Sequence, residues 1–225
     1  MKASLRAALA LGAAALVMGQ SANWNAAIAE TDGGHRVGNP EAEVRLMAFE
    51  SYTCNHCGNF EKEAEGALRI AYIHPGNITL EVRHIIRDPI DLTVVMLANC
   101  GPADKFFDNH RAFMLSQDGW LTDAQEKSQS QATINRWSNS DRAAGRRAIA
   151  QDLELYTILT NRGYSRTDLD RCLNDNAAAA EFARQTVEDG ERFGVNATPS
   201  FSINGELLDG VHSWGQLQPQ LDEQL

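Results

Sequence analysis

Two cysteines separated by two residues, Cys54 and Cys57, are the residues of this 225-residue chain whose type and spacing point most directly to chemistry. They lie between a buried-strand pattern over residues 44–49 and a helical pattern over residues 58–72. A helix start stabilises a thiolate through its unpaired N–H groups and its positive dipole end. We therefore expect a redox pair in which Cys54 is the nucleophile, with a pKa in the range of about 3.5 to 7.5. Cys57 is expected to be the less exposed, resolving thiol.

His56, between the two cysteines, is a further candidate catalytic residue. Its imidazole can place a hydrogen-bond donor or a positive charge beside the Cys54 sulfur and so favour the thiolate. A stabilised thiolate means a stabilised reduced form, and the corresponding disulfide is then a stronger oxidant. The residue type at position 56 therefore favours oxidation of substrates over their reduction.

Two other interpretations of the cysteine pair are a zinc site and a purely structural disulfide. Zinc would need a second close pair of ligands, whereas Cys100 and Cys172 stand alone in the sequence. Structural disulfides rarely span only two residues between a strand and a helix. The redox interpretation is favoured, and we expect neither a metal site nor a bound cofactor.

The hydrophobic pattern predicts the elements that would position this pair. Strands over residues 44–49 and 78–86 flank the helix over 58–72, and such a unit usually forms a parallel pair with a right-handed crossover. A polar, glycine-containing lead over residues 31–40 precedes it. A hairpin over residues 199–208 and a helix toward the C-terminus follow the helical region. That helical region has predicted helices at 92–100, 104–115, 124–137, 142–162, 167–174 and 177–193.

Two segments carry a family resemblance. Residues 49–60, Phe-Glu-Ser-Tyr-Thr-Cys-Asn-His-Cys-Gly-Asn-Phe, resemble the active-site segment of the DsbA-type thioredoxin-fold proteins, and residues 194–205 resemble the cis-proline segment of that family. The resemblance implies an α/β thioredoxin fold, strand–helix–strand followed by a hairpin and a C-terminal helix, with an inserted all-helical subdomain. The thioredoxin-like domain would comprise residues 30–88 and 194–225, and the helical insertion residues 89–193.

The same resemblance implies roles for four further residues. Pro199 would be the cis-proline that faces Cys54, and Thr198 would supply backbone hydrogen bonds to a bound substrate chain. Cys100 and Cys172 would form a second, structural disulfide, as in some relatives of the family. The alternative for these two cysteines is a pair of unrelated buried thiols.

The sequence departs from the family pattern at two positions. Asn55 stands where the family often has proline, so the family's redox potential does not carry over. Ala48 stands where the family often has a buried acid, six residues before the first cysteine. Glu50 lies in the same strand but is out of step with that position. The sequence therefore assigns no proton acceptor to Cys57, and water and Glu50 are the two candidates.

The N-terminus predicts export. Lys2 and Arg6 precede an apolar run over residues 7–17, which is the pattern of a signal peptide and is too short to span a bilayer. Small residues suited to cleavage occur at 19–21 and 27–29, so we assign residues 1–29 to the leader and the mature protein to the periplasm. An even number of cysteines fits an oxidising compartment. The net charge of −10 argues against nucleic acid as a partner.

We therefore expect a periplasmic oxidase that introduces disulfides into reduced exported proteins through a mixed disulfide at Cys54. A membrane partner linked to quinone would re-oxidise it. One alternative is a reductase or isomerase of the same fold, because a threonine before the proline at 199 also occurs in isomerase-like relatives. Another is a non-catalytic thioredoxin-like chaperone or a metal-binding module that uses the two thiols and His56 as ligands.

Overall fold

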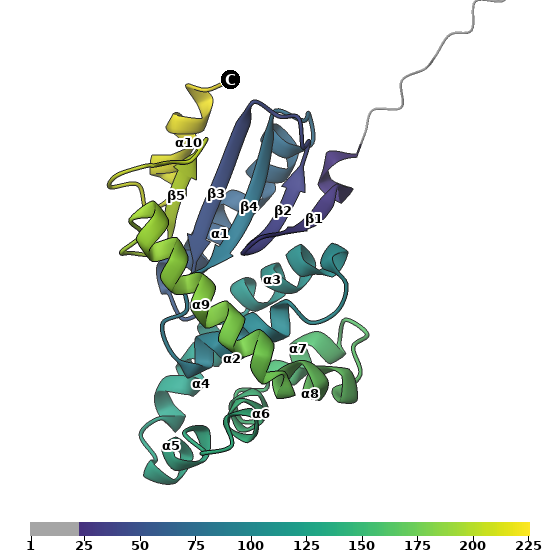
Figure 1. Ribbon diagram of the computed structural model, residues 1–225, viewed down its shortest axis with the longest axis vertical. Helices are drawn as coiled ribbons and strands as arrows, with labels where there is room; N and C mark the ends of the chain where they lie inside the picture. Colours follow the sequence, from purple (N-terminus) through teal and green to yellow (C-terminus); the bar gives the residue numbers. More distant parts are fainter. Residues whose placement is uncertain (1–22) are drawn as a thin grey trace, which may run out of the picture.

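A six-stranded mixed sheet forms the centre of the computed structural model, which describes residues 23–225 (Figure 1). Its strands, in the spatial order β1-β2-β4-β3-β5-β6, are Ile28–Thr31 (β1), Gly34–Gly38 (β2), Val44–Glu50 (β3), Ile78–His84 (β4), Ser200–Ile203 (β5) and Glu206–Leu207 (β6). Strands β3 and β4 are parallel, and every other pair is antiparallel. This arrangement confirms the predicted thioredoxin fold, in which the parallel pair is joined by a helix and the hairpin β5–β6 adds to β3.

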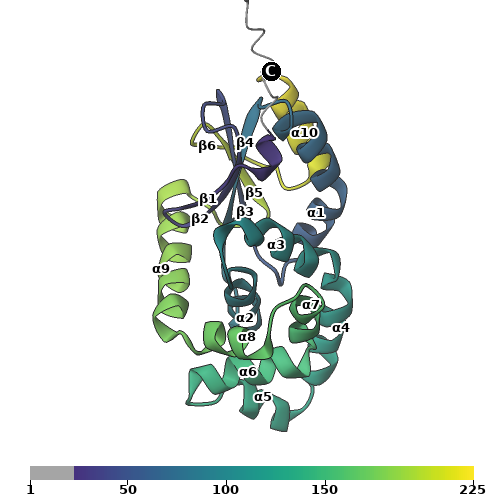
Figure 2. The same ribbon diagram turned by 90° about the vertical axis from the view of Figure 1, so that its right-hand side faces the viewer.

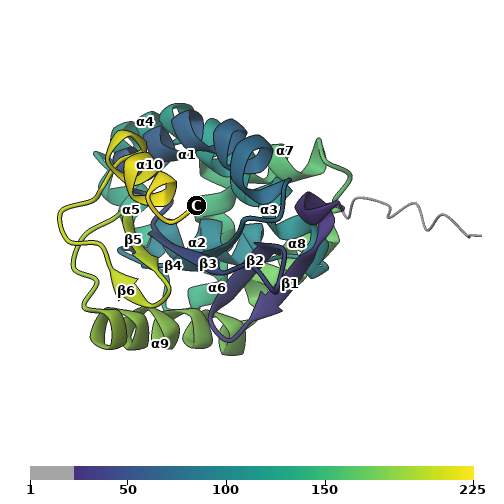
Figure 3. The same cartoon turned by 90° about the horizontal axis from the view of Figure 1, so that it is seen from above.

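Helices cover both faces of the sheet and fill one of its ends. Figures 2 and 3 show α1 and α10 on one face, α9 on the opposite face, and the helices from α2 to α8 as a block beyond the sheet. The helices are η1 (Trp24–Ala26), α1 (Asn55–Ala67), its π-helical continuation η2 (Leu68–Ile73), α2 (Pro89–Ala98), η3 (Ala103–Lys105), α3 (Phe106–Leu115), α4 (Gln117–Lys127), α5 (Gln131–Trp137), α6 (Arg142–Asp152), α7 (Leu155–Thr160), α8 (Arg166–Asn174), α9 (Asn176–Phe193) and α10 (Trp214–Asp222). The inserted helical subdomain is therefore present.

The polar lead predicted for residues 31–40 is wrong in part, because most of it belongs to the hairpin β1–β2. Gly33 has a φ of +111°, which lets the chain reverse between the two strands. Val37 of β2 is buried, and β2 pairs along β4, so the hairpin extends the sheet. A hairpin whose own residues are mostly polar carries little hydrophobic periodicity, and the burial of Val37 comes from the rest of the fold.

Two predicted helices are each divided in the structure. The helix predicted over 124–137 is interrupted before Ser130, whose hydroxyl caps α5 by accepting a hydrogen bond from the Thr133 N–H. The helix predicted over 142–162 is interrupted at Glu154, which has a left-handed backbone with a φ of 54°. Hydrophobic residues keep the helical period across the second interruption, at Ile149, Leu153 and Tyr156, so the period alone does not locate it. Residues 125–131, around the first interruption, include no hydrophobic residue and therefore give no period that could locate it.

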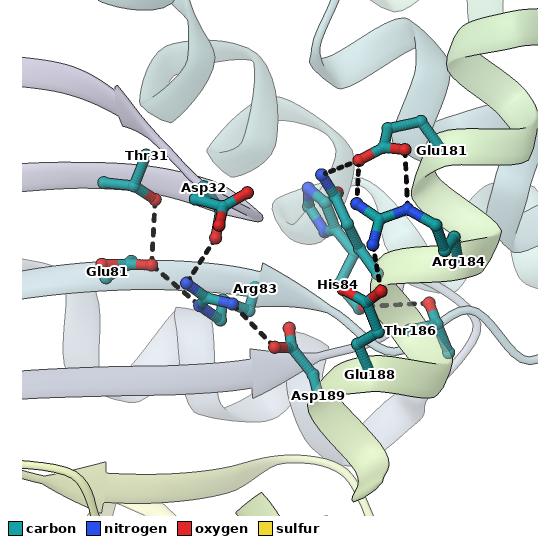
Figure 4. A network of polar contacts seen from close by, with 11 residues as sticks. Thr31, Asp32, Glu81, Arg83, His84, Glu181, Arg184, Thr186, Glu188 and Asp189 are labelled. Atoms are coloured by element: carbon teal, nitrogen blue, oxygen red, sulfur yellow. Dashed lines mark hydrogen bonds and ion pairs between the residues drawn. The ribbon is translucent and has the colours of Figure 1, made fainter. Parts of the chain in front are cut away.

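Helix α9 connects the helical block to the sheet (Figure 4). Arg83 of β4 donates to the Asp189 carboxylate of α9 at 2.7 Å and to the Asp32 carbonyl oxygen at 2.7 Å. The Thr186 hydroxyl donates to the carbonyl oxygen of His84 at 3.0 Å. The range 89–193, predicted as the insertion, thus includes a helix that begins in the block and then covers one face of the sheet.

The structure joins Cys100, just after α2, to Cys172 in α8, as the family resemblance implies. The two Cα atoms lie 5.8 Å apart, and the bond closes a loop with a sequence separation of 72. A crosslink that closes a loop of this length stabilises the fold by about 4 kcal/mol in the chain-entropy treatment. It fixes α8 beside α2, the helix that contacts the active-site loop.

The predicted leader falls mostly on residues 1–22, which lie outside the described residues. Residues 23–29, however, form η1 and half of β1, and the side chains of Trp24 and Ile28 pack against the core. A leader that ends at residue 29 would remove this part of the sheet, so that boundary conflicts with the fold. Within residues 23–225, no helix has the length and apolar character needed to cross a membrane.

Candidate active site

The two cysteines lie at the N-terminal end of α1, directly after the loop that follows β3. Cys54 is the N-cap residue, and its carbonyl oxygen accepts a hydrogen bond from the Cys57 N–H at 3.0 Å. Cys54 is 5% exposed and Cys57 is 0% exposed, and the two are not bonded to each other in this structure, which therefore represents the reduced form. The exposure order matches the expected division into an attacking and a resolving thiol.

Hydrogen bonding separates the pKa values of the two thiols. The pKa of Cys54 is lowered to about 5, and the largest cause is a hydrogen bond from the Cys57 thiol. Hydrogen bonds from Thr198 and from the backbone N–H groups of residues 56 and 57 lower the pKa further, whereas burial opposes them. Burial above all raises the pKa of Cys57 well above its ordinary value, and donation to Cys54 and the Glu50 charge add to this. At neutral pH, Cys54 is therefore a thiolate and Cys57 a neutral thiol.

The segment before β5 lies against Cys54. The Thr198–Pro199 peptide bond is cis, and the Cys54 sulfur lies 3.2 Å from the Thr198 carbonyl oxygen, to which it donates when it is protonated. The Pro199 carbonyl oxygen lies 2.7 Å from Nδ1 of His212. An open cavity of about 390 Å³, lined by Cys54 and residues 195–198, leaves room there for another chain. The assigned roles of Thr198 and Pro199 toward a substrate stay predictions.

His56 is exposed and lines the same cavity as Cys54. Residue 56 lowers the pKa of Cys54 through its backbone N–H, which faces the sulfur from the first turn of α1. A backbone N–H is present whatever the side chain. The catalytic role that the sequence assigns to the His56 imidazole therefore stays a prediction.

The helical insertion holds the loop before Cys54. The Asp91 carboxylate of α2 accepts hydrogen bonds from the Ser51 hydroxyl at 2.6 Å and the Tyr52 N–H at 2.9 Å. The side-chain amide of Gln117, in α4, donates to the carbonyl oxygens of Tyr52 at 2.7 Å and Cys54 at 3.0 Å. Both side chains are fully buried. The sequence interpretation missed Asp91 and Gln117, because a single polar residue within a helical pattern carries no signal of a distant partner.

Replacing Gln117 with alanine should destabilise the reduced protein by about 2 kcal/mol, because the buried Tyr52 carbonyl oxygen loses its side-chain donor and the Cys54 carbonyl oxygen loses one of its donors. The measurement is urea unfolding of the variant beside the wild-type protein. The exposed Gln125, which lies in the same helix, is the matched control, and Gln125→Ala should change the free energy of unfolding by less than about 0.5 kcal/mol. Equal losses in the two variants would contradict the positioning role of Gln117.

A buried acidic cluster lies behind Cys57. Nε2 of His110, from α3, lies 3.9 Å from Oε2 of Glu50 and 3.8 Å from Oε2 of Glu61. Nδ1 of the same imidazole lies 2.9 Å from the Tyr52 hydroxyl. Burial above all raises the pKa of Glu50 to about 8, which His110 opposes. Burial lowers the basicity of His110, but the carboxyls of Glu61 and Glu50 outweigh it and raise the pKa of the imidazole.

Glu50 lies two positions after Ala48, the position at which the family resemblance places a buried acid. Residues 48 and 50 are two apart in β3 and therefore point to the same face of the sheet. Ala48 is fully buried and has no group that can exchange a proton. Glu50 reaches the Cys57 side of the loop, where its charge contributes to the raised pKa of that thiol. An enclosed cavity of about 20 Å³, large enough for one water molecule, is lined by Glu50, Glu61 and His110.

The two thiols and His56 were considered above as ligands of a metal ion. Within residues 23–225, no group of three or more histidine, cysteine, aspartate or glutamate side chains is placed to hold a metal ion. The arrangement that the structure does contain is a thiolate at a helix start, a buried thiol behind it and a buried acid behind both. Such a set can exchange a disulfide and move the accompanying proton.

Comparison with known proteins agrees with this geometry. The family model described as Thioredoxin matches residues 30–223. A Rickettsia conorii protein, provisionally named a protein-disulfide oxidoreductase, is 26% identical over 191 residues, which cover 84% of this chain and 59% of that protein. A Rickettsia typhi protein of the same description is 26% identical over 75% of this chain and 54% of its own length. The chain thus spans little more than half of the curated relatives it matches.

Solved structures extend the comparison. A crystal structure described as a protein-disulfide isomerase from Novosphingobium aromaticivorans has 44% sequence identity and a TM-score of 0.81, over 86% of this chain and 98% of that one. The structure of α-DsbA1 from Wolbachia pipientis has 20% identity and a TM-score of 0.66, over 86% and 92% of the two chains, and supports the fold. With the matched residues, the cysteine pair and the helical insertion considered together, this chain belongs to the thioredoxin family, among its DsbA-like members.

Proposed function

We propose that this chain is a thiol–disulfide oxidoreductase that works as a protein disulfide oxidase. The observation that carries the proposal is the Cys54 pKa of about 5 beside a buried, neutral Cys57. In the oxidised protein, a substrate thiolate attacks the Cys54 sulfur, and Cys57 leaves as a thiolate and takes up a proton. A second substrate thiolate then attacks the substrate sulfur of the mixed disulfide. The substrate leaves as a disulfide, and two electrons remain on the reduced pair.

The substrates we propose are reduced exported proteins, and the compartment is the periplasm. The charged and apolar pattern of residues 1–17 supports export, and the fold of residues 23–29 supports a cleavage point before Asn23. Each turnover leaves two electrons on Cys54 and Cys57, so the protein needs an acceptor. A membrane partner linked to quinone fits this need in an oxidising compartment.

The test of the direction of electron flow is the equilibrium of the Cys54–Cys57 couple with glutathione. A pKa of about 5 for Cys54 lies between the values of about 7 for thioredoxin and about 3.5 for DsbA. We therefore expect a potential between about −270 and about −120 mV, the values of those two proteins. A potential at or below about −270 mV would contradict the oxidase. His56→Ser keeps the backbone N–H, so any fall in its potential measures the imidazole alone, and a fall is expected.

A second candidate function is disulfide isomerisation, favoured by the description of the 44% identical structure as an isomerase. An isomerase must remain reduced, because its Cys54 thiolate has to attack incorrect disulfides and then leave. The two functions predict different states of the pair in the cell. Trapping with a thiol-alkylating reagent in acid should find the pair oxidised for the proposed oxidase, and a fully reduced pair would favour the isomerase.

A further inference from the structure

An open cavity of about 690 Å³ lies outside the active site. It is bounded by the segment after β4, by the helical block and by α9. Three helices begin at its wall, because Pro89, Arg142 and Asn176 are the first residues of α2, α6 and α9 and all three line it. The positive ends of three helix dipoles therefore converge on one hollow.

The two acidic residues that line this cavity already accept hydrogen bonds from helix N–H groups. Oδ1 of Asp88 accepts hydrogen bonds from the first turn of α2, and Oδ1 of Asp141 accepts them from the first turn of α6. Three guanidinium groups, those of Arg87, Arg142 and Arg146, line the cavity with these two carboxylates, so positive charges outnumber negative ones. The cavity is thus positively charged within a chain whose net charge is −10.

Arg146 is the residue that points most strongly to a ligand. It is 6% exposed, and its guanidinium donates from Nε to the Leu173 carbonyl oxygen at 2.8 Å and from Nη2 to Oδ1 of Asn176 at 2.7 Å. Both acceptors are neutral, and within residues 23–225 no carboxylate lies within ion-pair distance of this guanidinium, although the charges of Asp141 and Asp175 act on it from further away. A buried charge without a carboxylate in direct contact is costly, so the site favours an incoming anion.

Arg87 connects this cavity with the active site. Its side chain lines both the 690 Å³ cavity and the 390 Å³ cavity beside Cys54. Its Nη1 donates to the Thr53 carbonyl oxygen at 3.3 Å, one residue before Cys54. A polypeptide that is bound at Cys54 and extends along Arg87 therefore enters the second cavity without leaving the surface.

We propose that the cavity is a substrate subsite for an aspartate or glutamate near the cysteine that reacts with Cys54. Arg146 and Arg142 receive the carboxylate, and the partly buried Leu92 and Trp137 contact the apolar part of the neighbouring substrate residues. Charge complementarity and continuity with the active site favour an acidic polypeptide as the occupant. The inference rests on the proposed function, and it adds a sequence preference to it.

The test uses the oxidised full-length protein and dithiol peptides that differ in one residue. Glutamate or glutamine is placed at successive positions on either side of the cysteine, and the second-order rate of peptide oxidation is measured at about 0.15 M ionic strength to screen distant charges. At the matching position, the glutamate peptide should react about five- to tenfold faster, as expected for a charge-assisted contact. Arg142→Glu should remove this preference and favour a lysine peptide. A glutamate at a first helical position is compatible with the helix dipole, so the variant should fold.

Arg171→Glu, in α8, is the control, since Arg171 is exposed and does not line the cavity. Equal effects of Arg142→Glu and Arg171→Glu would overturn the subsite, as would equal rates for the glutamate and glutamine peptides at every position in the wild-type protein. Failure to oxidise any peptide would instead contradict the proposed oxidase. In that case, calorimetric binding of the same peptides with serine in place of cysteine decides the subsite, and no preference for glutamate overturns it.

Discussion

Replacing Cys57 with serine should leave a substrate peptide covalently attached to Cys54, whereas replacing Cys54 with serine should abolish disulfide exchange altogether. The suitable probe is a peptide with a single cysteine joined to glutathione. The Cys54 thiolate attacks the peptide sulfur, and glutathione leaves with the electron pair of the broken bond. In the wild-type protein, Cys57 then attacks Cys54, the internal disulfide forms, and the peptide leaves as a thiol.

Intact mass measured after an acid quench distinguishes these outcomes. The Cys57→Ser variant should carry one peptide per chain, the wild-type protein should carry none at the end of the reaction, and the Cys54→Ser variant should never carry one. The burial of Cys57 explains the last result, because a fully buried, neutral thiol is a poor first nucleophile. An adduct on the Cys54→Ser variant, or none on Cys57→Ser, would reverse or refute the assignment of the two thiols.

Replacing Glu50 with glutamine should slow the release of the peptide from Cys54 by about 10²-fold, the lower end of the contribution of a positioned acid or base. The Cys57 proton must leave before that sulfur can attack, and Glu50 is the buried carboxyl whose charge reaches the thiol. Glutamine keeps the shape of the side chain but cannot accept the proton. Formation of the adduct should be unchanged, because it requires only the Cys54 thiolate. Glu63→Gln, exposed on α1, is the matched control and should change neither rate.

The pH dependence of this variant separates a proton-transfer role from a structural one. Only ionised Glu50 accepts a proton, so the wild-type release rate should rise with pH up to about 8, and the Glu50→Gln rate should lack this step. Stability changes in the opposite sense. The pKa of Glu50 in the folded protein is about 8, raised from the ordinary value of 4.5. Below about pH 4.5 the carboxyl is protonated in both the folded and the unfolded state, and its contribution to the stability of the folded state is complete. This contribution is lost as the pH rises to about 8, because the unfolded state releases its proton first.

Glu50→Gln should therefore gain stability relative to the wild-type protein over that pH window, as measured by urea unfolding at a series of pH values. A slower release at every pH, with an unchanged profile and a loss of stability, would indicate that Glu50 only supports the packing of the loop. In that case, another group accepts the Cys57 proton.

The sequence by itself determined the features that depend on neighbouring residues. The spacing of Cys54 and Cys57 between a strand and a helix predicts the nucleophile at a helix start, where the pKa of a thiol falls for local reasons. The hairpin at Asn204-Gly205 follows from the left-handed backbone that this pair adopts, with φ values of 54° and 91°. Family resemblance, rather than spacing, supplied the cis-proline and the pairing of Cys100 with Cys172, because partners far apart in the chain leave no local pattern.

Only the tertiary structure decided what surrounds the cysteines. The Tyr52 hydroxyl forms a hydrogen bond with His110, which is 58 residues away in the sequence, and Gln117 donates to the carbonyl oxygen of Cys54, which is 63 residues away. His110 and Gln117 each lie in a helix, where the hydrophobic period indicates which side is buried but not what it is buried against. The sequence likewise does not predict that Arg146 lacks a carboxylate in direct contact within the described residues, because the distances between charged side chains are set by tertiary packing. Long-range packing thus placed the buried acid and the charged cavity around a cysteine pair whose position at a helix start local sequence had already specified.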